Sequence, residues 1–133
     1  MKYDRLIESA INAAKCAYSP YSGFRVGAAL LCEDGAVYEG CNIENASFGA
    51  TCCAERIAIF GAVKAGKRSF KSICIVGYKD DLICEYCYPC GICRQVMAEF
   101  CAGDFEIVLF NGTNEKILKL NELLPYSFSG DIL

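Results

Sequence analysis

Residues 51–56, Thr-Cys-Cys-Ala-Glu-Arg, bring a thiol, a carboxylate and a guanidinium together at the expected start of a helix. A second stretch, residues 89–95, has the sequence Pro-Cys-Gly-Ile-Cys-Arg-Gln and is also expected to begin a helix. Cys90 and Cys93 are three residues apart, so on a first helical turn their side chains face the same way. Side chains lean toward the N-terminus of their helix, and Cys53 leans in the same sense on its own helix. We therefore predict that three thiols meet in front of two helix ends.

Three thiolates at one point suit a zinc ion, and a tetrahedral zinc ion with three protein ligands keeps its fourth position open, as catalytic sites do. We predict one zinc ion per subunit, held by Cys53, Cys90 and Cys93. Glu55 is expected beside the metal, where a carboxylate can move protons on the water that zinc activates. An acid in a first helical turn can also serve only to stabilise the helix dipole, and this alternative would be preferred without the cysteines.

Three thiolates carry more negative charge than one zinc ion offsets. The two helix N-termini contribute about half a positive elementary charge each and lower the pKa of nearby thiols. Arg56 and Arg94 lie close enough in sequence to donate hydrogen bonds to the sulfurs, and we expect Arg56 to support the ligands in this way. The alternative is that Arg56 is a solvated surface residue.

The composition excludes several chemistries. The chain has no histidine, which removes every mechanism that pairs histidine with serine or cysteine and every histidine-ligated metal. It has eleven cysteines and no apolar signal-peptide core, so we expect a cytoplasmic protein without a disulfide framework. Five scattered cysteines are expected to be small core residues, namely Cys16, Cys32, Cys41, Cys74 and Cys101.

Charge and hydropathy limit the partners. The net charge is −3, whereas a nucleic-acid-binding protein normally has a basic surface. No apolar run reaches the roughly 18–20 residues that a membrane span requires. The chain is 54% hydrophobic, with a mean hydropathy of +0.27, and this apolar excess indicates surface that is buried between subunits. We therefore expect a small-molecule substrate, no nucleic acid and no membrane.

The length of 133 residues predicts a single domain over residues 1–133. Helices are expected over residues 3–18, 51–65 and 89–103, with Thr51 capping the second and Pro89 opening the third. Strands are expected over residues 26–32, 36–43, 72–78, 105–110 and 116–120, with a loop over 79–88 and Asn121 capping a final turn. This order predicts an α/β fold, a three-layer α/β/α sandwich with a mixed sheet of about five strands. The second helix is apolar nearly all round, so we expect it to contact both the sheet and another subunit.

The combination of Cys53-Ala54-Glu55 with residues 89–93 resembles the zinc nucleoside and nucleobase deaminases. A cysteine as first ligand makes the chain similar to the small, three-cysteine, homotetrameric cytidine deaminases of the cytidine/deoxycytidylate deaminase family. Further segments resemble that family in the right order: PYSGFRVGAA at 20–29, GCNIENA at 40–46, CGICRQV at 90–96 and LLP at 123–125. The resemblance covers nearly the whole chain.

The resemblance implies hydrolysis of cytidine and 2′-deoxycytidine to uridine and 2′-deoxyuridine plus ammonia, a step of pyrimidine salvage. Glu55 would protonate N3 of the ring and then pass a proton to the leaving amine. Asn42 and Glu44 would bind the ribose hydroxyls, and an amide and a carboxylate on one strand face suit a 3′-hydroxyl. Without the resemblance, these two would be ordinary polar residues at a strand end.

By the same resemblance, Phe24 forms an aromatic wall against the pyrimidine and Ala54 offers backbone groups to the base. Tyr21 is a further candidate for the site. Phe128 would reach the site of a neighbouring subunit in a homotetramer. Phe48 stands where the family often has tyrosine, which removes a hydroxyl contact across the subunit interface.

Other assignments compete with this one. An iron–sulfur or four-cysteine zinc module would use the unbroken C-x2-C-x2-C-x2-C run of Cys84, Cys87, Cys90 and Cys93. Bacterial ferredoxins have a longer last spacing and a trailing proline. Both modules leave Glu55 and the pair of Asn42 and Glu44 unexplained, so we expect Cys84 and Cys87 in a loop near the metal. A blasticidin S-type deaminase is the nearest alternative enzyme, and the role of Cys52 is open.

Overall fold

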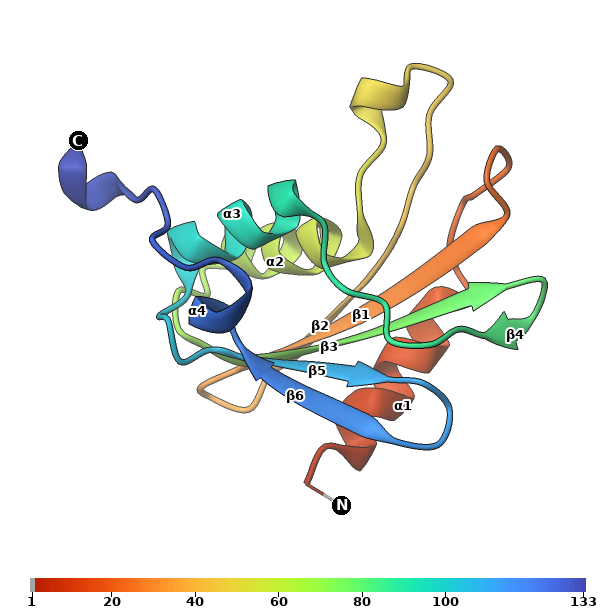
Figure 1. Cartoon of the computed structure of the whole chain (residues 1–133), viewed down its shortest axis with the longest axis horizontal. Coiled ribbons are helices and arrows are strands. Elements are labelled where there is room, and N and C mark those ends of the chain that lie inside the picture. The colour runs from red at the N-terminus through yellow and green to blue at the C-terminus, as the bar shows by residue number, and fades with distance from the viewer. Residues whose placement is uncertain (1) are drawn as a thin grey trace.

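The structure is a computed structural model that describes residues 2–133. Its main elements, in chain order, are α1 (Asp4–Ala14), β1 (Phe24–Cys32), β2 (Val37–Cys41), α2 (Ala54–Lys64), β3 (Phe70–Lys79), β4 (Leu82–Ile83), α3 (Gly91–Phe100), β5 (Glu106–Phe110), β6 (Glu115–Lys119) and α4 (Leu120–Leu123) (Figure 1). Two short 3-10 turns, η1 (Phe48–Ala50) and η2 (Gly130–Ile132), complete the set. Among residues 2–133, no helix is long and apolar enough to cross a membrane.

The strands form one mixed sheet in the order β2-β1-β3-β5-β6, and β4 pairs with β3 beside this path. β3 and β5 run parallel, whereas the other neighbours are antiparallel. The five predicted strands are all present, and β3 lies at the centre of the sheet. β4 lies inside the segment that was predicted to be a loop, because two residues give no recognisable period.

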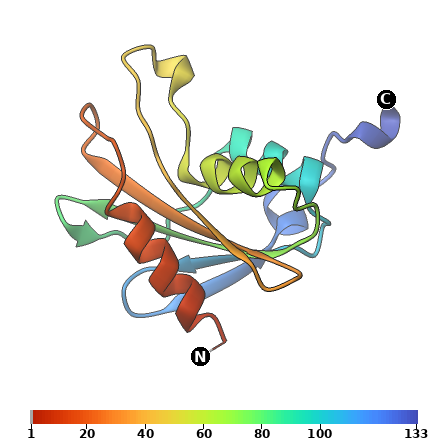
Figure 2. The ribbon, with the colours of Figure 1, turned by 180° about the vertical axis from the view of Figure 1, so that it is seen from behind.

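Alternating side chains of the strands build two cores. Ile73 and Ile75 of β3 face the layer of α2 and α3, whereas Cys74 and Val76 face α1. Figures 1 and 2 show α1 on one face of the sheet and α2 with α3 on the other. The predicted three-layer α/β/α sandwich is therefore confirmed.

The starts of α2 and α3 differ from the prediction in the same way. α2 begins at Ala54 with Cys53 as N-cap, two residues after the predicted cap. Thr51 does not cap the helix because its hydroxyl accepts a hydrogen bond from the Asn45 N–H, 3.1 Å away. Cys90 is the N-cap of α3, so Pro89 precedes the helix and does not open it. Both helix starts thus have a cysteine at the cap position.

Other boundary predictions were also imprecise. α1 ends at Ala14, well before residue 18, and Cys16 is exposed beyond it, so the prediction that Cys16 is a core residue is wrong. Asn121 lies inside α4, and the cap position belongs to Lys119. Cys32 and Cys74 are buried as expected, whereas Cys41 and Cys101 are only partly buried.

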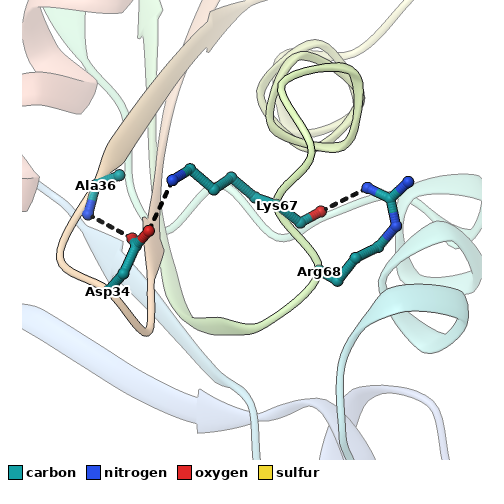
Figure 3. Close-up of polar contacts among 4 residues, drawn as sticks. All are labelled: Asp34, Ala36, Lys67 and Arg68. Carbon is teal, nitrogen blue, oxygen red and sulfur yellow. Dashed lines mark hydrogen bonds and ion pairs between the residues drawn. The ribbon is translucent and has the colours of Figure 1, made fainter.

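The turn between β1 and β2 is tied to the loop that follows α2 (Figure 3). The Asp34 carboxylate accepts a hydrogen bond from the Ala36 N–H at 3.0 Å and pairs with the Lys67 ammonium at 2.7 Å. The Arg68 guanidinium donates to the Lys67 carbonyl at 2.8 Å. These contacts lie at the C-terminal end of α2, so they fix that helix at the end away from its cysteine.

Candidate active site

The two cysteine-capped helix starts meet above one end of the sheet. The sulfurs of Cys53, Cys90 and Cys93 all lie within 4.8 Å of one another. The separation between the Cys53 and Cys90 sulfurs is 3.8 Å. Sulfurs bound tetrahedrally at about 2.3 Å from a zinc ion lie about 3.8 Å apart. The three residues therefore fit a zinc ion.

Negative charge among the three cysteines is concentrated on Cys53. The pKa of Cys53 is lowered to about 5, because its sulfur accepts a hydrogen bond from Cys93 and lies close to the Arg56 guanidinium. The pKa of Cys93 is raised, because its thiol donates that hydrogen bond and is buried. The pair thus holds a thiolate beside a thiol, and a metal replaces the shared proton.

The two arginines beside the sulfurs have different contacts. Arg56 Nη2 lies 3.5 Å from Cys53 Sγ and 3.5 Å from the Thr51 carbonyl oxygen, the kind of contact expected from the sequence. Arg94 donates instead to the carbonyls of Pro89 and Leu123, at 2.8 Å each. It therefore joins the start of α3 to the end of α4.

Glu55 is buried, with 4% of its surface exposed, in the first turn of α2. Burial raises the pKa of its carboxyl to about 7, from an ordinary value of 4.5. A carboxyl group that titrates near neutral pH can both accept and donate a proton in that range. This is what a proton-transferring residue beside a zinc-activated water requires.

A cavity of about 310 Å³ opens beside these groups. Six residues that the sequence analysis proposed lie in its wall together with Cys90: Phe24, Asn42, Glu44, Cys53, Ala54 and Glu55. Cys87, which was expected in a loop near the metal, also lies in the wall, and four further residues there were not predicted: Ser22, Val26, Thr51 and Tyr88. Tyr88 directly precedes Pro89 and Cys90, and this adjacency was the one signal that could have identified it. The cavity is large enough for a small-molecule substrate.

Asn42 and Glu44 are both partly engaged with backbone. Asn42 is 8% exposed, and its amide accepts from the Val26 N–H and donates to the Phe24 carbonyl, at 2.8 Å each. Glu44 accepts from the backbone N–H groups of Tyr21, at 2.9 Å, and Ser22, at 3.2 Å. The two side chains therefore also hold the segment that leads into β1.

Two predicted site residues lie outside this cavity. Tyr21 lines a separate hollow, where its ring packs edge to face against Phe48 with the centroids 6.2 Å apart. Phe128 is 57% exposed on the C-terminal segment, which extends away from the sheet in Figure 1, and its carbonyl accepts a hydrogen bond from Gln95. Within one chain, Phe128 does not line the cavity.

The alternative four-cysteine site does not form. Among residues 2–133, the group of side chains arranged to hold a metal consists of Cys53, Cys90 and Cys93, and it includes neither Cys84 nor Cys87. Cys87 lines the cavity, and burial raises the pKa of its thiol to about 12. Cys87 therefore belongs to the wall of the cavity and not to the group of sulfurs that can share one metal ion.

Residues 1–109 match the family model described as the cytidine and deoxycytidylate deaminase zinc-binding region. The chain belongs to this family. The match agrees with the sulfur geometry, so zinc is confirmed as the metal of the deaminase site.

The similarity to known cytidine deaminases covers nearly the whole chain. It is 47% identical to the cytidine deaminase of Sporosarcina psychrophila, covering 100% of this chain and 96% of that protein. It is 46% identical to the cytidine deaminase of Halalkalibacterium halodurans, covering 98% and 97%. The crystal structure of the cytidine deaminase from Burkholderia pseudomallei superposes with a TM-score of 0.89 at 45% identity, covering 96% of this chain and 100% of that one. The deaminase fold predicted from the sequence is therefore confirmed.

Proposed function

We propose that the protein hydrolyses cytidine and 2′-deoxycytidine to uridine and 2′-deoxyuridine, with release of ammonia, as a step of pyrimidine salvage. The observation that carries the proposal is the cavity in which buried Glu55 lies beside the cysteine cluster, with Asn42 and Glu44 in the same wall. Full-length relatives named cytidine deaminases support it. The whole chain, residues 1–133, acts as one catalytic domain in this proposal.

Cys53, Cys90 and Cys93 hold the zinc ion, which when bound supplies a water molecule activated for attack on the ring. Glu55 takes a proton from that water and delivers it to N3 of the cytosine ring. As the C4–O bond forms, the second proton of the water is left on the new C4 hydroxyl. Glu55 would then move that proton to the amine, so that the C4–N bond breaks and ammonia leaves. A pKa of about 7 allows Glu55 to serve as base and then as acid. Arg56 stabilises the Cys53 thiolate throughout.

The remaining hydrogen-bonding capacity of Asn42 and Glu44 matches one hydroxyl group. Asn42 has already used one amide N–H and one carbonyl lone pair, which leaves one donor and one acceptor. Glu44 retains one free lone pair on Oε2. A ribose hydroxyl can donate to Glu44 and accept from Asn42 at the same time. The ring of Phe24 and the backbone of Ala54 are then left for the base.

We also propose that the protein is a homotetramer in the cytosol whose active sites are completed by neighbouring subunits. Exposed aromatic side chains support this: Phe48 is 77% exposed, Phe128 57% and Tyr21 56%. On α2, Phe60 is 44% exposed on the side away from the sheet. Light scattering coupled to size exclusion tests the assembly, and a monomeric, fully active protein would contradict it.

The test of the activity is an ultraviolet assay with cytidine and deoxycytidine on protein of measured zinc content. Glu55→Gln is the matched variant, because it keeps the shape of the side chain and removes its proton transfer. It should retain zinc and lose roughly 10²–10⁴-fold in kcat. Zinc-loaded protein that leaves cytidine unchanged but converts blasticidin S would overturn the substrate assignment. Near-normal kcat in the variant would overturn the role of Glu55.

A further inference from the structure

Glu44 is held by a single short loop. Its Oε1 accepts hydrogen bonds from the N–H groups of Tyr21, at 2.9 Å, and Ser22, at 3.2 Å. Its Oε2 accepts a hydrogen bond from the Ser22 hydroxyl. Both carboxylate oxygens are thus bound by the segment of Tyr21 and Ser22. The hydrogen bond to Oε2 comes from the Ser22 hydroxyl.

The loop is itself fixed from two directions. The Ser22 hydroxyl accepts a hydrogen bond from the Phe24 N–H at 3.0 Å, where β1 begins. The Ser22 carbonyl accepts from the Lys79 ammonium at 2.5 Å, where β3 ends. Gly23 allows the tight path between them with a φ of +70°, a backbone conformation that favours glycine. Ser22 is therefore placed by two strands, although it is exposed to solvent.

A count of lone pairs shows what Ser22 contributes. Oε1 has two lone pairs, and two N–H groups occupy them. Oε2 has one lone pair taken by the Ser22 hydroxyl and one left for a ligand in the cavity that Ser22 and Glu44 both line. The last torsion of a glutamate side chain is broad, so an unrestrained carboxylate rotates readily. The Ser22 hydroxyl fixes that rotation and so fixes the direction of the free lone pair.

We propose that Ser22 is a positioning residue that orients Glu44 toward the ribose hydroxyl of the substrate. The inference rests on the proposed function, since it needs a substrate with a ribose. The Ser22 hydroxyl donates its hydrogen bond to Glu44 and accepts one from the Phe24 N–H, so Ser22 acts on the substrate through Glu44. Binding of the nucleoside should depend on Ser22, whereas the chemical step at the metal should not.

The experiment compares Ser22→Thr with Ser22→Val, which are nearly matched in shape and differ in the hydroxyl. Steady-state assays with cytidine should give a KM for the valine variant about tenfold above that of the threonine variant, the scale of one hydrogen bond to a charged group. The kcat and zinc content of the two should agree within about twofold. Ser47→Ala is the control, because Ser47 lies in a nearby exposed loop and its hydroxyl has no hydrogen-bond partner within residues 2–133.

A double-mutant cycle with Glu44→Gln tests whether Ser22 acts through Glu44. The difference in KM between threonine and valine should shrink to less than about threefold in the Glu44→Gln background, because the charged acceptor is absent. Equal KM values for the two Ser22 variants, or an undiminished difference beside Glu44→Gln, would overturn the inference. Failure of the unmodified protein to convert cytidine would instead overturn the proposed function.

Discussion

Gly40→Ala should weaken zinc binding although Gly40 touches neither the metal ligands nor the cavity. Gly40 lies on β2 against the first turns of α2, the helix whose N-cap is Cys53. A Cβ added at Gly40 would lie 2.3 Å from the Ala54 carbonyl oxygen and 2.6 Å from the Ala58 nitrogen. Both atoms are helix backbone, so a side-chain rotation cannot relieve the clash. The start of α2 must move away from the sheet.

The structure gives the size of this movement. The contact of 2.3 Å is about 1.1 Å short of the 3.4 Å at which ordinary van der Waals contact begins. Zinc–ligand distances tolerate about 0.2 Å, so a displacement of that order cannot be absorbed at the metal. We expect about a 10- to 100-fold loss of zinc affinity, the range seen when support of metal ligands is removed. Overpacking should also lower the free energy of unfolding by about 1–3 kcal/mol.

Gly27→Ala is the matched control. A Cβ there would lie 2.0 Å from the Ala10 carbonyl oxygen, so it pushes α1 on the opposite face of the sheet. Urea denaturation should show both variants destabilised, whereas competition with a chromogenic zinc chelator should show weaker binding for Gly40→Ala alone. The reasoning is refuted if Gly40→Ala binds zinc as tightly as the unmodified protein, or if both variants lose zinc equally.

Three further predictions concern the site itself. Cys90→Ala should abolish stable zinc binding, and full occupancy by elemental analysis would contradict the ligand set. Asn42→Ala and Glu44→Ala should lower kcat/KM for cytidine far more than any activity on free cytosine; an equal loss on both would refute ribose binding. In protein stripped of zinc by a chelator, Glu55→Gln should raise the free energy of unfolding at pH 8 by about 3 kcal/mol. The pKa of Glu55 is raised to about 7 in the folded protein, so its ionised carboxylate destabilises the fold only as the pH rises above the unfolded pKa of 4.5. The same gain at pH 4.5 would contradict this.

The sequence predicted the metal site well because its determinants are local. Cys90 and Cys93 are three residues apart, so their side chains face the same way even though α3 begins two residues later than predicted. Moving the N-cap of α2 from Thr51 to Cys53 therefore left the ligand set unchanged. The apolar run from Ile73 to Val76 is likewise local, and it was enough to predict the strand β3.

The missed residues depend on contacts that no sequence period records. Ser22 joined the site because Glu44, on a different segment, binds its backbone and its hydroxyl. Thr51 does not cap α2, and its hydroxyl instead accepts a hydrogen bond from the Asn45 N–H, six residues earlier. Tyr88 reaches the cavity wall through the path of the chain before α3. Each case is a competition between partners that only the folded chain brings together.

The cysteine caps explain how a site with three thiolates keeps its charge in balance. Serine, threonine or aspartate at an N-cap would bind the free N–H groups of the first turn, and such a cap contributes about 1 kcal/mol. Neither Cys53 nor Cys90 makes a side-chain cap hydrogen bond. No cap side chain therefore neutralises the positive ends of α2 and α3, and the partial positive charge of the helix ends beside the sulfurs stabilises thiolates. The two helices therefore lack side-chain caps, and the positive charge at their N-termini stabilises the thiolates of the metal site. Arg56 adds a full positive charge beside Cys53.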